Sequence, residues 1–228
     1  MGVHDGHRER LRENFLEYGL ESANDLNALE LLLFYAIPRR DTNTIAHELI
    51  NRFGSLGGVF RASLEELCDV PGIGRNAAAL ILLVPQIVKK SYVSETKSLV
   101  QVKCSEDAGK YLMPRFMNEQ DEVAFLLCLD SQNRIIKCAE VGRGIVDSVD
   151  INTRIIVETA VKCKASSVII SHNHPDGIAL PSPADGNATK QIAKSLALVG
   201  IQLIDHIIVS GDDYVSFSDS GFMRLLKM

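Results

Sequence analysis

The chain has 228 residues, of which 46% are hydrophobic and 23% charged, an ordinary composition for a globular protein of one or two domains. Its net charge is −5, and both halves are acidic: residues 1–99 carry 11 basic and 13 acidic side chains, and residues 100–228 carry 13 and 16. These numbers exclude a protein that holds DNA by bulk positive charge, so any nucleic-acid contact requires a local basic patch.

The N-terminus, "MGVHDGHRERLREN", is polar and lacks the apolar core of a secretory signal. We expect no stretch long and apolar enough to span a bilayer, and hence no membrane partner. The five cysteines include no close pair, which argues against a disulfide framework and against a cysteine zinc cage. Together these features predict a cytoplasmic protein in a reducing compartment.

Residues 1–95 are predicted to form a small all-α domain. Apolar spacing, N-cap residues and glycine stops predict helices at 7–20, 24–37, 42–54, 63–70 and 75–90. A "PGIG" turn separates the last two helices, and no segment has the alternation of a strand.

Residues 100–228 are predicted to form an α/β domain, after a boundary segment at 91–105. Short apolar runs bounded by Gly and Asp turns predict strands at 122–130, 134–144, 166–174 and 205–218. Helical patterns lie between them at 152–165 and 182–200. Strands that alternate with helices indicate an α/β layer architecture.

The stretch "SHNHPDGIALPSPADG" carries the candidate chemistry. His172 and His174 follow a buried strand and, two residues apart, point to the same face. A loop rich in Pro and Gly leads to Ser182, and Asp185 follows in the first turn of a helix, from which it could return to the histidines. Two His and one carboxylate form a recurring catalytic zinc set that leaves the fourth position to water, whose pKa zinc lowers to about 7. Other divalent ions would also fit such ligands.

A second interpretation of the same residues is structural. Ser182 and Asp185 have the spacing of a capping box, with Pro183 in the first helical position. The histidines would then be polar residues at a strand end.

The spacing His172-x-His174, seven residues, Ser182, two residues, Asp185 resembles the signature of the JAMM (MPN+) metalloproteases. The wider set "LLCLDSQNRII", "GRGIVDS", "SHNHPDG", "PSPAD" and "LIDHIIVSGDDYVSFSDSG" resembles, in order, the bacterial RadC family, over nearly the whole chain. The resemblance implies a JAMM/MPN-type mixed-sheet α/β domain in which His172, His174 and Asp185 bind one Zn²⁺. It also implies that Ser182 stabilises the oxyanion and that an upstream Glu is the general base.

Two glutamates are candidates for that base: Glu122, which begins a predicted strand, and Glu140, on the next strand. The JAMM pattern favours Glu122. For either glutamate, the alternative is an exposed residue at a strand end with no catalytic role. His206 has two readings, orientation of a ligand or a purely structural role, and the structural role is preferred. Asp176 departs from the family's usual Ser, and we expect a solvated loop residue there.

The segment around "PGIG" resembles a helix–hairpin–helix motif. Gly72 and Gly74 permit a tight turn that presents backbone amides to a phosphate, and Arg75 stands where a phosphate contact would be useful. Such a contact would position DNA without reading its sequence. The alternative is a turn that only packs two helices.

Three functions therefore compete. The first is a zinc-dependent hydrolase of the metallopeptidase or isopeptidase class, acting on a peptide or protein. The second is a DNA-binding protein with a structural metal, and the third is a metal-dependent nuclease linked to DNA repair. A deaminase is excluded because the H-x-E and PCxxC elements are both missing. The sequence leaves the scissile bond and the oligomeric state open.

Overall fold

The computed structural model describes residues 3–38, 40–144, 153–175 and 177–226. The chain divides into two compact units, Met1–Val88 and Lys89–Met228. The division falls inside one long helix, α6 (Arg75–Glu95), which the first unit begins and the second continues.

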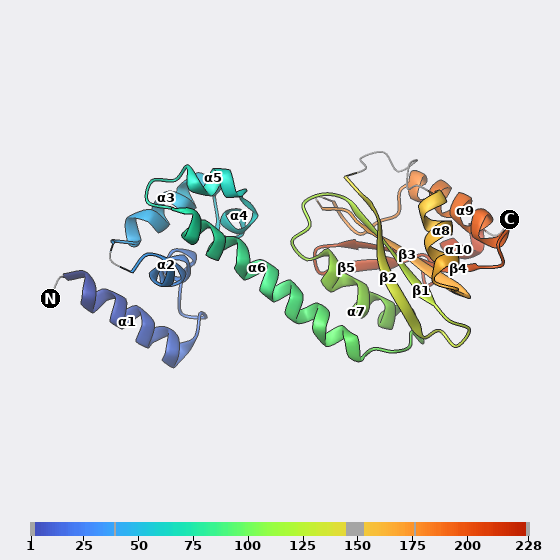
Figure 1. Ribbon diagram of the computed structural model, residues 1–228, viewed down its shortest axis with the longest axis horizontal. Coiled ribbons are helices and arrows are strands. Elements are labelled where there is room, and N and C mark those ends of the chain that lie inside the picture. The colour runs from blue at the N-terminus through green and yellow to red at the C-terminus, as the bar shows by residue number, and fades with distance from the viewer. Residues whose placement is uncertain (1–2, 39, 145–152, 176, 227–228) are drawn as a thin grey trace. The chain divides into compact units, whose positions relative to one another are not determined.

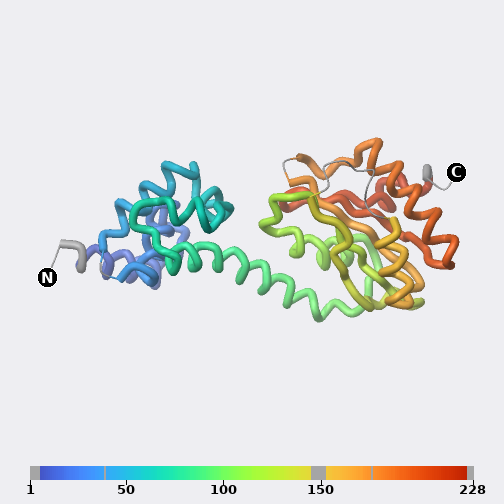
Figure 2. The backbone as a smooth tube through the Cα atoms, turned by 45° about the horizontal axis from the view of Figure 1, so that its top comes forward, coloured from blue at the N-terminus to red at the C-terminus, as the bar shows by residue number. Residues whose placement is uncertain are grey.

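The first unit consists of helices and loops throughout its described residues (Figure 1, Figure 2). Before α6 these are α1 (Val3–Tyr18), α2 (Asp25–Ala36), α3 (Asn43–Phe53), α4 (Leu56–Arg61) and α5 (Leu64–Cys68). The predicted all-α character is confirmed. The six-residue α4 was not predicted; it is capped by Ser55, whose side chain accepts from Gly58 N at 3.1 Å.

The turn between α5 and α6 packs tightly against the core of this unit. Gly72 has φ +95°, and a Cβ at this position would lie 2.7 Å from Cδ1 of Ile45. Ile73 is buried beside it, whereas a Cβ on Gly74 would meet open space. A side chain at position 72 would therefore be strained in backbone and in packing, so this glycine has a structural reason independent of any ligand.

One expectation about α6 was wrong. The helical run Arg75–Ser98, which is α6 followed by the 3₁₀ turn η1 (Thr96–Ser98), is long and apolar enough to cross a membrane by length and composition alone. Its most apolar 18 residues have a mean hydropathy of 1.3, and 17% of them are buried. Helices buried in a protein core can have the same length and composition. The first turns of α6 lie in such a core, because Ala77, Ala78 and Ile81 belong to the core of the first unit.

The second unit is built on a five-stranded mixed sheet with the order β2-β1-β3-β4-β5. The strands are β1 (Val123–Leu129), β2 (Ile135–Arg143), β3 (Ser167–Asn173), β4 (Gln202–Ser210) and β5 (Asp213–Ser216). β3 and β4 are parallel, and every other neighbouring pair is antiparallel. The predicted mixed-sheet α/β domain is confirmed; the last predicted strand is a hairpin of β4 and β5.

Helices cover both faces of this sheet (Figure 1). One face packs against α8 (Thr153–Lys162), α9 (Pro183–Ala197) and α10 (Phe222–Leu226) through a cluster that includes Ile156, Ile192 and Met223. The opposite face packs against α7 (Ser105–Phe116). Residue alternation therefore assigns each strand side chain either to the α8/α9 face or to the α7 face.

Candidate metal centre

The two histidines lie at the C-terminal end of β3, and Asp185 lies in the first turn of α9. His172 pairs with Ala124 of β1, whose side chain belongs to the α8/α9 core, so His172 points toward the helix that carries Asp185. His174 follows the strand directly, and its amide continues the pairing by donating to Val209 O at 2.8 Å. The loop before α9 thus returns the carboxylate to the histidines, as the sequence indicates.

Three potential ligand atoms converge here. His172 Nε2 lies 3.0 Å from His174 Nε2 and 3.3 Å from Asp185 Oδ1, and all three ligand groups fall within 4.8 Å of one another. A tetrahedral zinc ion with bonds of about 2.0–2.1 Å requires ligand atoms about 3.3 Å apart. The spacing therefore fits a divalent ion.

The capping box at the start of α9 orients the carboxylate. Asp185 Oδ2 accepts from Ser182 N and from Ser182 Oγ, both at 2.7 Å, and Ser182 Oγ in turn accepts from Asp185 N at 3.1 Å. Oδ1 is left to face His172. Burial raises the pKa of Asp185, but the neighbouring His172 ring and the bonds from Ser182 outweigh it, and the net pKa is well below the usual range. The same carboxylate thus caps α9 through Oδ2 and leaves Oδ1 available as a candidate metal ligand.

His174 is held by the loop that follows it. Its Nδ1 lies 3.1 Å from the carbonyl oxygen of Ile178, which can only accept, so Nδ1 carries a proton and the neutral ring presents its lone pair on Nε2. Ser210 of β4 fixes the same loop by donating to the carbonyls of His174 and Gly177 at 3.0 and 2.8 Å. A lone pair on Nε2 facing a carboxylate oxygen is unfavourable without a cation between them, which supports a metal at this position.

His206 contacts the centre from β4. Its Nε2 lies 2.8 Å from His172 Nδ1, and its Nδ1 lies 2.6 Å from Thr189 Oγ1 of α9. His206 is fully buried, and burial together with the field of His172 holds its pKa well below the usual range. Of the two roles open for this residue, the contact with a ligand histidine supports the orienting one.

The two candidate bases lie on opposite faces of the sheet. Glu122 stands two residues before Ala124, and its carbonyl accepts from Gly144 N at 2.8 Å, which continues the β1–β2 pairing. Alternation therefore places Glu122 on the face of His172. Glu140 pairs with Phe125, whose ring contacts Phe116 of α7 at 5.1 Å, so Glu140 belongs to the α7 face.

Glu140 is also engaged in an ion pair. Its carboxylate accepts from Arg143 Nε and Nη2, both at 2.9 Å, and this interaction lowers the pKa of Glu140. A carboxylate held by a guanidinium is a weak proton acceptor, so the structure supports Glu122 over Glu140 as the base.

Asn173, between the two histidines, is a functional candidate that the sequence analysis missed. It is buried on the α7 face; its Oδ1 accepts from Val123 N at 2.6 Å and its Nδ2 donates to Asp121 O at 3.0 Å. These two hydrogen bonds fix the backbone on both sides of Glu122. A polar amide at the end of a strand that the sequence predicts to be buried was the signal that could have identified it.

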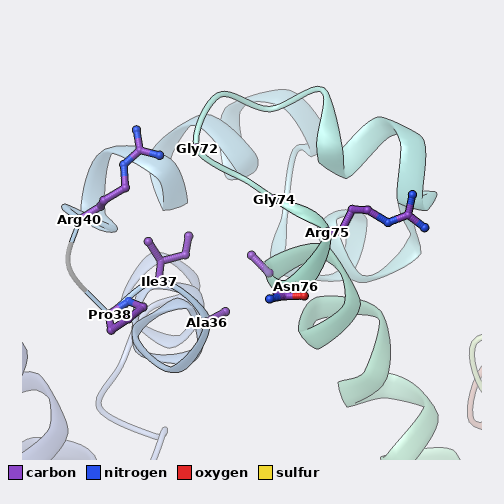
Figure 3. Close-up of a pocket in the computed structure, with 9 residues that line it drawn as sticks. Ala36, Ile37, Pro38, Arg40, Gly72, Gly74, Arg75 and Asn76 are labelled. Carbon is purple, nitrogen blue, oxygen red and sulfur yellow. The ribbon is translucent and has the colours of Figure 1, made fainter.

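The candidate phosphate contacts belong to the first unit, apart from the metal ligands. Gly72, Gly74 and Arg75 line a pocket of about 710 Å³ together with Arg40 and Asn76. Figure 3 shows the Arg40 side chain at one end of the pocket and Arg75 at the other, directed away from Arg40. Asp176, by contrast, lies outside the described residues.

A mixed sheet between helical layers that brings two histidines and an aspartate together at a strand end defines a JAB (MPN)-type α/β domain. Residues 102–222 match the family described as "RadC-like JAB domain", and residues 6–79 match "UPF0758 N-terminal". The chain is also 36% identical to "UPF0758 protein FN0909" of Fusobacterium nucleatum subsp. nucleatum, over 96% of this chain and 97% of that protein. The chain therefore belongs to the RadC (UPF0758) family.

Proposed function

We propose that the protein is a zinc-dependent hydrolase of the metallopeptidase or isopeptidase class, with one ion held by His172, His174 and Asp185. The observation that carries the proposal is the convergence of these three side chains: His172 Nε2 lies 3.0 Å from His174 Nε2 and 3.3 Å from Asp185 Oδ1, and His174 Nε2 lies 3.8 Å from Asp185 Oδ2. His172 and Asp185 are buried, whereas 21% of the His174 side chain is exposed, so a substrate could reach the centre from that side. Three ligands leave a fourth position for water or substrate.

When bound, zinc would polarise a carbonyl and lower the pKa of a coordinated water to about 7. The chain's own groups would do the rest. Glu122, on the face of His172, would accept the proton of the attacking water and return it to the leaving amine. Ser182 would hold Asp185 through its present bond, and its hydroxyl would be the donor that stabilises an oxyanion at the centre. Two imidazoles favour zinc over Mg²⁺, which prefers oxygen ligands.

The direct test combines metal analysis with substrate panels. We expect about one zinc per chain and hydrolysis of peptide or isopeptide bonds that is lost on chelation and on His174→Ala. The His47→Ala variant is a matched control, because His47 is an exposed histidine of the first unit. The proposal would be contradicted if the purified wild type took up no zinc. It would also be contradicted if the His174→Ala variant hydrolysed the substrate panel as well as the wild type.

DNA binding by the first unit is the second candidate. The supporting observation is the pocket at the α5–α6 turn, where Arg40, Arg75 and the free amides at the start of α6 are available to a phosphate (Figure 3). In this reading the α5–α6 segment acts as a helix–hairpin–helix, and the metal domain would act at DNA, as repair or recombination would require. Salt-dependent binding of duplex DNA that weakens on Arg75→Ala would support it. Cutting of the same DNA, lost on His172→Ala, would instead identify the nuclease.

We also infer a cytoplasmic protein. All five cysteines are free thiols, which is the state that a reducing compartment maintains. Immunolocalisation, or fractionation of cells with and without detergent, would test this inference for the full chain, including the apolar run of α6.

A further inference from the structure

We propose that His206 and Thr189 are positioning residues that hold His172 in the tautomer with its proton on Nδ1, so that the Nε2 lone pair is always directed at the metal position. The proposal rests on the proposed metal site and goes beyond it, since it concerns what prepares the ligand before the ion arrives. It depends on the direction of three hydrogen bonds in a row.

The first direction is set at Thr189. Its hydroxyl lies 2.5 Å from the carbonyl oxygen of Asp185, one turn earlier in α9. A carbonyl oxygen can only accept, so at this distance the hydroxyl proton must lie between the two oxygens. Thr189 is fully buried, and no rearrangement toward water offers its hydroxyl another partner. Because the single hydroxyl proton of Thr189 is used in the hydrogen bond to Asp185 O, the hydroxyl oxygen can only accept a hydrogen bond from its other neighbour.

That neighbour is Nδ1 of His206, at 2.6 Å, which must therefore carry a proton. His206 has no exposed surface, and its two ring nitrogens face Thr189 and His172, so neither nitrogen makes a hydrogen bond to a carboxylate and burial disfavours a charge on the ring. A neutral imidazole with its proton on Nδ1 presents a lone pair on Nε2. This lone pair, 2.8 Å away, accepts from Nδ1 of His172.

The consequence is a one-way relay that links two ligands of the same site. It begins on the ring of His172 and ends on the backbone of Asp185. If the hydrogen bonds ran in the opposite direction, the Thr189 hydroxyl proton would point toward His206. Thr189 Oγ1 and Asp185 O would then lie 2.5 Å apart with no proton between them, which is strongly repulsive. The same reversal would also put the proton of His172 on Nε2, 3.0 Å from His174 Nε2 and 3.3 Å from Asp185 Oδ1, where it would occupy the position of the ion. Partners that fix the tautomer of a ligand histidine typically contribute about 10- to 100-fold in metal affinity.

The test has one arm without metal and one with it. In metal-free protein, long-range ¹H–¹⁵N spectra of the imidazoles should show His172 and His206 protonated on Nδ1. In Thr189→Val, which keeps the side-chain volume and removes the hydroxyl, His172 should gain the Nε2-protonated form. Thr189→Ser should restore the original spectrum. A neutral wild-type His172 that carries its proton on Nε2 and none on Nδ1 would overturn the proposal without recourse to any variant.

In the second arm, zinc affinity is measured by competition with a chelator. Thr189→Val should bind zinc about 10- to 100-fold more weakly, and Thr189→Ser should bind within about threefold of the wild type. The matched control is Thr42→Val, since Thr42 is equally buried and its hydroxyl has no partner among the described residues. Zinc affinity in Thr189→Val within twofold of the wild type would overturn the relay. A wild type that takes no zinc would overturn the proposed function, while the first arm would still decide the tautomer.

Discussion

At the residue scale, the two glutamates near the centre make the sharpest contrast. Glu122 extends β1 on the face of His172, while Glu140 lies on the other face and is bound to Arg143. We expect Glu122→Gln to lower kcat by about 10²- to 10⁴-fold, the range of a general base, while zinc content stays at one per chain. Glu140→Gln, an isosteric change on the same pair of strands, should stay within a few-fold of the wild type. Equal losses in both variants would show that neither carboxylate is the base.

Asn173 supports a second prediction at this scale. Its amide accepts from Val123 N and donates to Asp121 O, the backbone groups on either side of Glu122. Asn173→Ala should cost about 1–3 kcal/mol of stability, because a buried N–H loses its acceptor. It should also lower kcat about tenfold or more through displacement of Glu122, while zinc is retained. Ser171→Ala is the control, since Ser171 lies two residues earlier on the same face and its hydroxyl has no partner in the described chain. Full activity in Asn173→Ala would exclude this role.

The sequence could identify the ligands themselves but not what holds them. His172, His174 and Asp185 lie within fourteen residues, so strand alternation and a helix start are enough to predict their meeting. His206, Thr189 and Asn173 act through neighbours that only the β3–β4 register and the packing of α9 bring into contact. A register is set by side chains on several strands at once, so the spacing within one strand cannot reveal it.

At the scale of elements, the chain offers two capping boxes of the same design. Ser63 caps α5 through Glu66, and Ser182 caps α9 through Asp185, but only the second carboxylate faces histidines. Ser63→Ala and Ser182→Ala should each lower helix or domain stability by about 1 kcal/mol. Only Ser182→Ala should also weaken zinc binding, by about tenfold, because Asp185 loses the bond that aligns its free oxygen. Unchanged zinc affinity with reduced hydrolysis would instead assign Ser182 to the oxyanion.

The turn between α5 and α6 gives another matched pair. Gly72→Ala forces a side chain into φ +95° and toward Ile45, and should destabilise the first unit by about 1–3 kcal/mol. Gly74→Ala meets open space and should cost about 1 kcal/mol or less, the difference between Gly and Ala at a helix start. Chemical denaturation followed by the helical signal measures both. Similar losses of stability in the two variants would mean that the contact of Gly72 with the core does not determine the conformation of the turn.

Helices and strands with a regular apolar period were predictable, and the irregular ones were not. The sequence indicates α6 through Pro85, since the apolar spacing continues on both sides of it. It does not predict α7, which contains Gly109 and Pro114 and begins at the last residue of the predicted boundary segment at 91–105. The close packing of α7 against β5 requires a glycine at position 109, because a Cβ there would lie 2.7 Å from the ring of Tyr214. A residue selected for contact with a distant strand weakens the local helical signal.

At the scale of the whole molecule, the two units have separate cores. Every member of the first core, from Leu26 to Leu82, precedes the division at Val88, and every member of the two clusters on the sheet follows it, from Leu99 onward. The sequence predicts this separation from the change between helical and strand patterns. The predicted helix at 75–90 already crosses this division, but the sequence does not show that the helix continues to Glu95, because residues 91–105 have the composition of a boundary segment.

The separate cores lead to a prediction about the second unit alone. A chain of Lys89–Met228 retains both sheet clusters, the three ligands, the His206 relay and the ion pair of Lys89 with Glu119. We expect it to unfold cooperatively by circular dichroism and to bind zinc within about threefold of the full chain, since domains with their own core can fold alone. It should lack any DNA binding, because the pocket with Arg40 and Arg75 is absent. A fragment that melts without cooperativity would show that the first unit, or the apolar start of α6, is needed to complete the fold. Retained DNA binding would move the nucleic-acid contact to the metal domain and so favour the nuclease over the peptidase.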